Sequence, residues 1–381
     1  MKKQLSVAVL GCGVMGNTII SGIKDMKEIK RIVGYDVVES QMVETQKNHP
    51  GIEINPDIDA LLADEDIDLV YIAASNATHV PLAVKALRAG KAVMTEKPSG
   101  VTFEEIDELE RVQKETGGFL QVGLECRYSW AYMTVKEVVA SGEIGELKNV
   151  HFTYSMPPFS DTIRLANGEE VPDWRVTTET SGNMYLEKLC HYIDLVRWWN
   201  EGSRVDKFMI GSAENVIPYF EIEDNAHVSY HFDNGCVSHL YFNMTAAPGH
   251  NNDLLGKDDL FDQDKQGHKL NYVISGTEGA IEVDIFQRQV RVYHHPGKPG
   301  QIGESIKRTL SWDKIEGGNY VKGETEHIYF HNTLEQNQDI VRRVLAGDKP
   351  SITIQDAQET MRLCLDFTEA AKNKAWEVVY R

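Results

Sequence analysis

The amino-terminal residues have the types and spacing of a loop that binds a dinucleotide. The apolar run Leu5–Leu10 leads into Gly11-Cys12-Gly13-Val14-Met15-Gly16, a GxGxxG motif between an expected strand and an expected helix. Glycines at these positions let the backbone approach a pyrophosphate, which the amino terminus of the helix stabilises. A tight turn without a ligand is the alternative. The strand before the motif and the helix after it favour a nucleotide site.

A carboxylate follows at the end of the next expected strand. Asp36 lies twenty residues past Gly16. A carboxylate at this place accepts hydrogen bonds from the ribose hydroxyls and repels a 2′-phosphate. We therefore predict that the cofactor is NAD rather than NADP.

The polar turn Ala73–His79 follows another expected strand. Ligands of an open parallel sheet bind outside the carboxyl ends of its strands, so we expect Ser75, Asn76 and His79 to contact the cofactor. A helix cap formed by Asn76 or Thr78 is an alternative that is compatible with this role.

A lysine stands at the next strand end, in Glu96-Lys97-Pro98. Proline restricts the backbone of the residue before it, so Lys97 is held on the rim of the nucleotide site. We expect Glu96 and Lys97 to contact the cofactor. A solvated surface lysine is the alternative.

A third group of polar residues lies on a helix expected from about residue 184 to 199. Glu187, His191 and Asp194 are spaced i, i+4 and i+7, which places them on one helix face. Such a face can orient a histidine and make it a general base near neutral pH. An exposed salt-bridged face, or a core histidine satisfied by Glu187, are the alternatives.

The elements that position these residues alternate up to about residue 125. Buried apolar runs predict strands, and the segments between them predict helices near 15–26, 39–48, 79–89 and 103–116. The strands are Leu5–Leu10, Arg31–Asp36, Leu69–Ala73, Ala92–Thr95 and Phe119–Leu124. This pattern predicts an α/β fold with a doubly wound parallel sheet.

From about residue 149 the pattern changes to longer alternating segments with turn residues between them. They predict an α+β domain with an open, mostly antiparallel sheet, containing strands Asn149–Tyr154, Ala226–Phe232, Cys236–Thr245, Tyr272–Ser275 and Gln289–His294. The stretch 246–268 predicts a long loop, and helices near 331–346 and 355–373 close the chain. We predict a Rossmann domain over 1–125 and a substrate-binding and oligomerisation domain over 126–381.

Composition excludes several classes of function. The 381 residues carry 39 Lys and Arg against 58 Asp and Glu, a formal charge of −19. That charge disfavours nucleic acid and membrane surfaces as partners. No run of about 18 apolar residues is present to span a bilayer. The scattered cysteines predict neither disulfides nor a metal site, which favours a reducing cytoplasmic location: Cys12, Cys126, Cys190, Cys236 and Cys364.

The three motifs together resemble the Gfo/Idh/MocA family of sugar and cyclitol oxidoreductases. The resemblance spans nearly the whole chain, and further matching pieces are 141–145, 173–175 and 276–279. It implies that Lys97 binds the reacting hydroxyl and that the His191 helix supplies the proton acceptor. Glu187 stands where the family commonly has aspartate. The resemblance also implies a homodimer or homotetramer.

Several residues near these motifs are candidate substrate contacts, each with a role in packing or in an ion pair as the alternative. Besides Lys97, His191 and Asp194 they are Arg127, Tyr128, Trp174, Arg175 and Lys188.

The resulting hypothesis is an NAD-dependent dehydrogenase that oxidises a secondary hydroxyl of a sugar, glycoside or cyclitol. Lys97 and His191 are both candidates for the base. A redox-neutral enzyme that retains NAD and acts through a transient keto intermediate, giving glycoside cleavage, elimination or epimerisation, is a second hypothesis. A non-catalytic NAD-binding regulator is a third.

Overall fold

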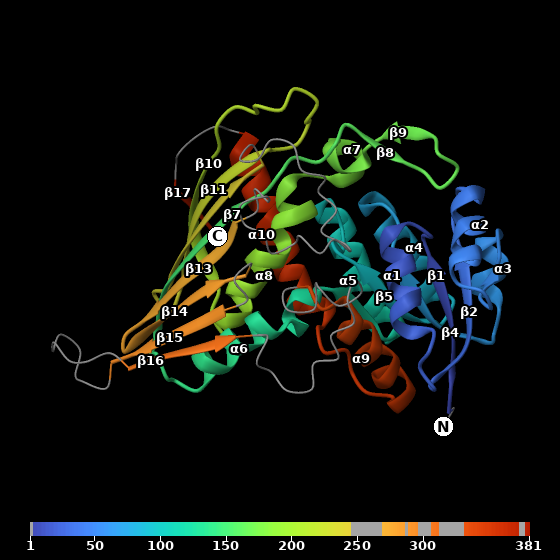
Figure 1. Ribbon diagram of the computed structural model, residues 1–381, viewed down its shortest axis with the longest axis horizontal. Helices are drawn as coiled ribbons and strands as arrows, with labels where there is room; N and C mark the ends of the chain where they lie inside the picture. The colour runs from blue at the N-terminus through green and yellow to red at the C-terminus, as the bar shows by residue number, and fades with distance from the viewer. Residues whose placement is uncertain (1–2, 245–268, 286–288, 296–305, 312–330, 373–377) are drawn as a thin grey trace. The chain divides into compact units, whose positions relative to one another are not determined.

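The computed structural model describes residues 3–244, 269–285, 289–295, 306–311, 331–372 and 378–381 (Figure 1). They belong to two compact units. The first comprises Met1–Glu125, Ser160–His191 and Thr333–Leu365, and the second comprises the remaining segments. The predicted second domain, 126–381, therefore includes two segments that belong to the first unit.

A six-stranded parallel sheet is the centre of the first unit, with the order β3-β2-β1-β4-β5-β6. Every residue of β1 is buried, as expected for a strand that helices cover on both faces. This order is that of a Rossmann sheet, in which ligands bind where the order reverses. The strands are β1 (Leu5–Leu10), β2 (Ile29–Tyr35), β3 (Glu53–Ile54), β4 (Ile67–Ile72), β5 (Ala92–Glu96) and β6 (Leu120–Gly123).

The helices of this sheet come from both ends of the chain. Those between the strands are α1 (Val14–Ile23), α2 (Glu39–Asn48), α3 (Ile58–Ala63), α4 (His79–Arg88) and α5 (Phe103–Thr116). Near the carboxyl terminus, α9 (Thr333–Ala346) buries Ile340 and Val341 in the same apolar cluster as Ile19 and Ile20 of α1. Burial of this apolar helix face explains why α9 belongs to the first unit.

The last long helix, α10 (Ile354–Lys372), is tied to the first unit by a buried glutamine. Gln358 donates to the carbonyl oxygens of Ser99 and Ile106 at 3.3 and 3.2 Å, and its own oxygen lies 3.1 Å from the Ser99 hydroxyl. Three hydrogen bonds satisfy a polar side chain that is only 1% exposed. The predicted closing helices therefore both exist, and their contacts extend the first unit.

A nine-stranded sheet is the centre of the second unit, with the order β16-β15-β14-β13-β7-β12-β11-β10-β17. Neighbouring strands are antiparallel except for the parallel pair β7 and β12. The strands are β7 (Leu147–Ser155), β10 (Val205–Gly211), β11 (Asn225–Phe232), β12 (Val237–Asn243), β13 (Lys269–Gly276), β14 (Gly279–Asp284), β15 (Gln289–His294), β16 (Ile306–Ser311) and β17 (Val378–Tyr380).

Aromatic side chains fix one face of this sheet to α6 (Trp130–Ala140) and α8 (Cys190–Trp199). Tyr192 of α8 stacks on Phe152 of β7 with ring centroids 4.8 Å apart. Tyr132 of α6 meets Tyr272 of β13 edge to face at 5.8 Å. Such contacts bury large apolar areas, so the alternation of buried residues along β7 follows from this packing.

The predicted fold class is confirmed: a parallel doubly wound sheet and a second, mostly antiparallel sheet. The short elements β3 and α3, and helix α6, were not among the expected elements. The predicted loop 246–268 lies outside the described residues. Within the described part of the chain, no helix combines the length and the apolar character that a bilayer span requires.

Candidate active site

Steric crowding requires glycine at two positions of the first turn. A Cβ atom on Gly16 would lie 1.8 Å from the Gly11 carbonyl oxygen, and one on Gly11 would lie 2.3 Å from that of Ala73. Gly13 differs, because its φ of −76° suits any residue and an added Cβ would meet no described heavy atom within 4 Å. The open space beside Gly13 fits a ligand that passes close to the backbone, as a pyrophosphate does.

Helix α1 begins at this open space. Val14 and Met15 form its first turn, in which no acidic residue is present, and Val14 is exposed. The positive end of the helix dipole and its free N–H groups are therefore available to an anion.

Asp36 organises the glycine loop. One of its carboxylate oxygens accepts from the Cys12 N–H at 2.7 Å, and the other accepts from the Val38 N–H at 2.8 Å. A carboxylate has about four acceptor positions, so each oxygen keeps one for a ribose hydroxyl. The predicted residue thus joins the ends of β1 and β2 in addition to any contact with the cofactor.

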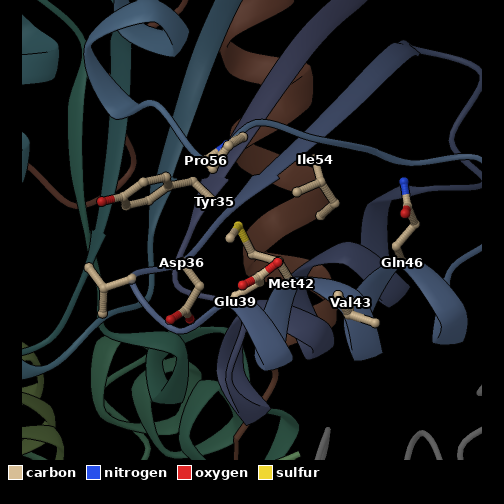
Figure 2. A pocket seen from close by; sticks show the side chains of 9 residues that line it. Tyr35, Asp36, Glu39, Met42, Val43, Gln46, Ile54 and Pro56 are labelled. Carbon is tan, nitrogen blue, oxygen red and sulfur yellow. The ribbon is translucent and has the colours of Figure 1, made fainter.

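Asp36 lines a pocket of about 640 Å³. Figure 2 shows that Asp36 and Glu39 are both among its lining side chains. Two carboxylates disfavour a 2′-phosphate, which supports NAD over NADP. The sequence motif identified only Asp36 among the lining residues. The others come from the end of β2 and the turn after it, from α2 and from the β3 region: Tyr35, Val37, Glu39, Met42, Val43, Gln46, Ile54 and Pro56.

Alanine substitutions should separate the structural glycines from the ligand-facing one. Gly16→Ala should unfold or strongly destabilise the protein, because its Cβ would overlap a backbone oxygen. Gly13→Ala should leave the melting temperature nearly unchanged and weaken NAD binding by about tenfold or more, a loss of about 1.4 kcal/mol. Calorimetric titration with NAD and thermal unfolding test this pair. Unchanged NAD affinity in Gly13→Ala would contradict the placement of the pyrophosphate.

Asn76 connects the loop after β4 to a distant segment. In the 3-10 turn Asn76–Thr78, its amide donates to the Ser181 carbonyl oxygen at 3.0 Å and to Glu187 Oε2 at 2.9 Å. Neither Asn76 nor Thr78 makes a side-chain cap at this turn or at α4, so the capping alternative is wrong. Thr78 instead donates to the Ser75 carbonyl oxygen at 2.7 Å.

His79 joins two loops at the nucleotide end of the sheet. Its Nδ1 lies 2.9 Å from the Pro98 carbonyl oxygen and its Nε2 lies 3.0 Å from that of Ala74. The residue is 1% exposed, and burial lowers its pKa despite these two acceptors. His79 thus lies in the predicted region and acts there as a buried link between the Ala74 and Lys97-Pro98 turns.

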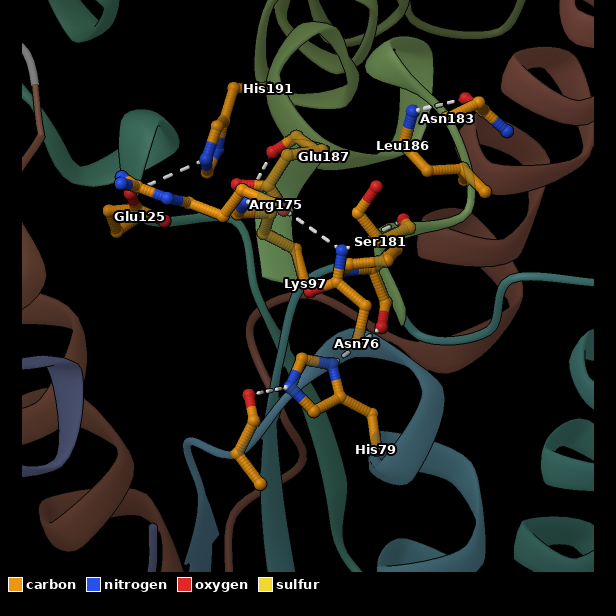
Figure 3. Close-up of polar contacts among 12 residues, drawn as sticks. Asn76, His79, Lys97, Glu125, Arg175, Ser181, Asn183, Leu186, Glu187 and His191 are labelled. Atoms are coloured by element: carbon orange, nitrogen blue, oxygen red, sulfur yellow. Dashed lines mark hydrogen bonds and ion pairs between the residues drawn. The ribbon is translucent and has the colours of Figure 1, made fainter. Parts of the chain in front are cut away.

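Lys97, which is partly buried, forms an ion pair with the buried Glu187 (Figure 3). Its Nζ donates to the Glu187 carbonyl oxygen at 2.5 Å and lies 3.8 Å from the Glu187 carboxylate. Burial lowers the pKa of Lys97, but Glu187, Cys190 and Glu125 outweigh it, so the pKa is raised above its usual value. Lys97 is therefore a cation at neutral pH and a hydrogen-bond donor.

The helix that carries Glu187 is not a regular α-helix. Tyr185–Leu189 form a π-helical turn, which α8 continues from Cys190. A single π turn changes the α-helical spacing and is frequent at functional sites. This turn directs the Glu187 carboxylate to Asn76 and Lys97 instead of to the orienting role beside His191 that the spacing predicted.

The carboxylate that faces His191 belongs to Glu125. His191 Nε2 lies 3.6 Å from Glu125 Oε1, with side-chain exposures of 3% and 5% (Figure 3). Glu125 follows β6, so the rule that functional residues follow strand ends could have identified it. Glu125 was not among the predicted site residues, because it lies outside the helix whose spacing indicated Glu187 and Asp194.

Glu96 lies beside this pair and is 6% exposed. Burial and the charge of Glu125 raise the pKa of Glu96 to about 8. A Cβ atom at the neighbouring position 123 would lie 2.7 Å from Glu96 Oε2, so a larger residue there would displace the Glu96 side chain. The side chain predicted to contact the cofactor is thus a buried carboxyl group that keeps its proton at neutral pH.

The raised pKa of Glu96 predicts a pH dependence of stability. The folded state binds this proton more tightly than the unfolded chain, so stability falls as the pH rises from about 4.5 to about 8. Glu96→Gln, which cannot ionise, should show a flatter decline in melting temperature over this range. Thermal unfolding at several pH values tests this, with the exposed Glu104→Gln as the control. Parallel curves for wild type and Glu96→Gln would contradict the assignment.

Three of the predicted substrate contacts belong to the second unit. Arg127 and Asp194 form a buried bidentate salt bridge with two N–O distances of 2.7 Å. The Tyr128 carbonyl oxygen accepts from the Asn332 amide at 3.0 Å. Arg127 and Asp194 thus form an ion pair, which was the alternative to a substrate contact.

The other predicted substrate contacts belong to the first unit. Arg175 pairs with the fully buried Asp173, and the Trp174 carbonyl oxygen accepts from Thr180 Oγ1 at 2.5 Å. Lys188 is half-buried on the π-helical turn. Among the first-unit site residues, the structure thus brings together Asn76, Lys97 and Glu187, and it places His191 with Glu125.

The Rossmann sheet, the open glycine turn and the Asp36 pocket define an NAD-binding oxidoreductase. Residues 5–124 match the family model "Oxidoreductase family, NAD-binding Rossmann fold", and residues 132–282 match the "GFO/IDH/MocA C-terminal domain". The chain belongs to the GFO/IDH/MocA family, as its motifs predicted.

Two curated relatives show how the similarity is distributed. The 1-carboxy-3-chloro-3,4-dihydroxycyclohexa-1,5-diene dehydrogenase of Comamonas testosteroni is 24% identical over 97% of this chain and 95% of its own. Inositol 2-dehydrogenase 2 of Saccharopolyspora erythraea is 29% identical, over 51% of this chain and 53% of that enzyme. The chain thus spans only about half the length of the inositol enzyme it matches.

Solved structures share the fold. Levoglucosan dehydrogenase in complex with NADH and levoglucosan has a TM-score of 0.78 and 20% identity, covering 99% of this chain and all of that one. GenD2 from gentamicin A biosynthesis, in complex with NAD, has a TM-score of 0.75 and 21% identity, covering 100% and 97%. NAD is therefore the cofactor bound by neighbours of the same fold.

Proposed function

We propose that the protein is a dehydrogenase that oxidises a secondary hydroxyl of a sugar, glycoside or cyclitol. The observation that carries the proposal is the Lys97–Glu187 ion pair at the carboxyl end of β5. A lysine in this position can donate a hydrogen bond to a hydroxyl oxygen. It also stabilises negative charge on that oxygen as the carbonyl forms.

Lys97 and His191 have different roles in the proposed oxidation. When NAD is bound, its nicotinamide ring accepts the hydride from the carbinol carbon. Lys97 holds the hydroxyl oxygen, and its raised pKa supports the role of charge stabiliser rather than base. His191 takes the hydroxyl proton, since a buried imidazole is suited to general base catalysis near neutral pH.

The names of relatives support the substrate class. Besides the inositol enzyme, D-xylose dehydrogenase of Paenarthrobacter nicotinovorans is 26% identical over 40% of this chain. Cyclitols and pentoses both present secondary hydroxyls on a ring. We therefore propose a ring polyol as the substrate. We also propose a homo-oligomer, as the family resemblance implies, and a cytoplasmic location, which the free cysteines of the described residues support.

The test is NADH formation with a panel of inositols, sugars and glycosides, followed by near-ultraviolet absorbance, with NADP in parallel. Accumulation of NADH with one class supports the proposal and identifies the substrate. Product formation without NADH would favour the redox-neutral alternative, in which NAD is regenerated in each turnover. Binding of NAD without any turnover of the panel would favour a regulator. Light scattering during size-exclusion chromatography tests the oligomer.

A further inference from the structure

Glu125 and His191 form an acid–base pair that is separate from Lys97 and Glu187. The two residues are 66 positions apart in the sequence, and their facing atoms are 3.6 Å apart. Both side chains are at most 5% exposed, so little water screens their interaction. If His191 gains a proton, its positive charge therefore interacts strongly with the Glu125 carboxylate.

The Lys97 cation is already engaged elsewhere. Its Nζ contacts both the carbonyl oxygen and the carboxylate of Glu187, which also accepts from Asn76. Figure 3 shows the Lys97–Glu187 contact and the His191–Glu125 contact as two distinct pairs. The short ion-pair contacts thus join Lys97 to Glu187 and His191 to Glu125.

Glu96 sets the total charge around His191. Glu96 is the last residue of β5 and Glu125 follows the neighbouring strand β6, and the two strands pair at Glu96 and Gly123. Because Glu96 keeps its proton at neutral pH, the two carboxyl groups carry one negative charge rather than two. Lys97, which follows β5, and Glu187 and Cys190 on the His191 segment are further titratable groups of this cluster. His79 interacts electrostatically with Lys97 and Glu187.

We propose that Glu125 is a positioning residue for the oxidation, which stabilises the imidazolium that His191 forms. This inference rests on the proposed function. As the O–H bond of the substrate breaks, an N–H bond forms on His191, and the carbinol carbon becomes a carbonyl carbon by giving up the hydride that bound NAD would accept. Glu125 then balances the positive charge on the imidazole, and the proton later passes to solvent. Because Glu96 is neutral, no second carboxylate raises the proton affinity of His191, so His191 can release the proton.

The experiment compares Glu125→Gln and Glu125→Asp with the control Glu104→Gln, each as the full chain with NAD added. Nitrogen NMR follows the protonation of His191, assigned by comparison with His191→Asn. Loss of an opposite charge at this distance should lower the proton affinity of His191 by about tenfold or more in Glu125→Gln. Glu125→Asp should restore part of this affinity, and Glu104→Gln should match wild type.

Kinetics with the active polyol supply the second measurement. Glu125→Gln should lower kcat by about tenfold or more, with KM and NAD affinity within about twofold of wild type. An unchanged His191 titration in a folded Glu125→Gln protein would overturn the inference, even if the enzyme is a dehydrogenase. If wild type oxidises no polyol, the proposed function fails, and so does the catalytic role of Glu125, whatever the titration shows.

Discussion

Lys97→Met is expected to lower kcat by about 10²–10³-fold, because it removes the donor that stabilises charge on the reacting oxygen. Methionine keeps most of the length and apolar volume of the lysine chain, so the loss reports the ammonium group. KM for the polyol should rise as well, since Lys97 also holds the hydroxyl in the ground state. Steady-state kinetics with the substrate found in the panel measure both constants.

The same substitution should also cost stability. It leaves the Glu187 carboxylate, 8% exposed, without the cation that lies 3.8 Å away, a loss of up to about 3–5 kcal/mol. Lys91→Met is the matched control, because Lys91 is buried and donates to the carbonyl oxygen of Asp64 at 2.6 Å. The control should lose stability but keep its kcat. Equal kcat values for Lys97→Met and wild type would refute the role of Lys97.

His191→Ala is expected to lower kcat by about 10²–10⁴-fold, the usual contribution of a general base. NAD affinity should remain within about twofold of wild type, because the glycine turn and Asp36 come from other segments. The loss should shrink at high pH, where hydroxide can remove the substrate proton directly. Calorimetric NAD binding and a pH profile of kcat separate this outcome from misfolding.

His231→Ala is the control for this substitution. His231 is also paired with a carboxylate, since its Nδ1 lies 2.8 Å from Asp206, but it lies on β11 of the second sheet. The control should keep both kcat and NAD affinity. Retained activity in His191→Ala together with lost activity in Lys97→Met would assign the base to another group.

The cofactor site could largely be predicted from the sequence because its signals are local. The glycine turn, Asp36 and the alternating strands lie close together along the chain, and their backbone requirements follow from residue type. The crowding at Gly11 and Gly16 agrees with the glycine turn that the GxGxxG motif predicted. The exception is Glu39, whose carboxylate lines the pocket only because α2 packs beside β2.

The partners of Glu187 and His191 could not be predicted in the same way. The i, i+4 spacing of Glu187 and His191 assumed a regular α-helix, but the segment begins with a π-helical turn. Asn76 and Lys97 take up the Glu187 carboxylate from loops about a hundred residues earlier in the chain. No periodicity within one helix carries that information.

The sequence by itself determined the Rossmann strands and the glycine turn, and it indicated Lys97 and His191 as candidate reactive residues. These features depend on residue types and on their spacing over short stretches of sequence, which set the local backbone conformation. Only the tertiary structure decided that Glu187 faces Lys97 and that Glu125 faces His191. The reason is physical: a carboxylate interacts with the charge that folding brings within a few ångströms, and packing between distant segments sets those distances.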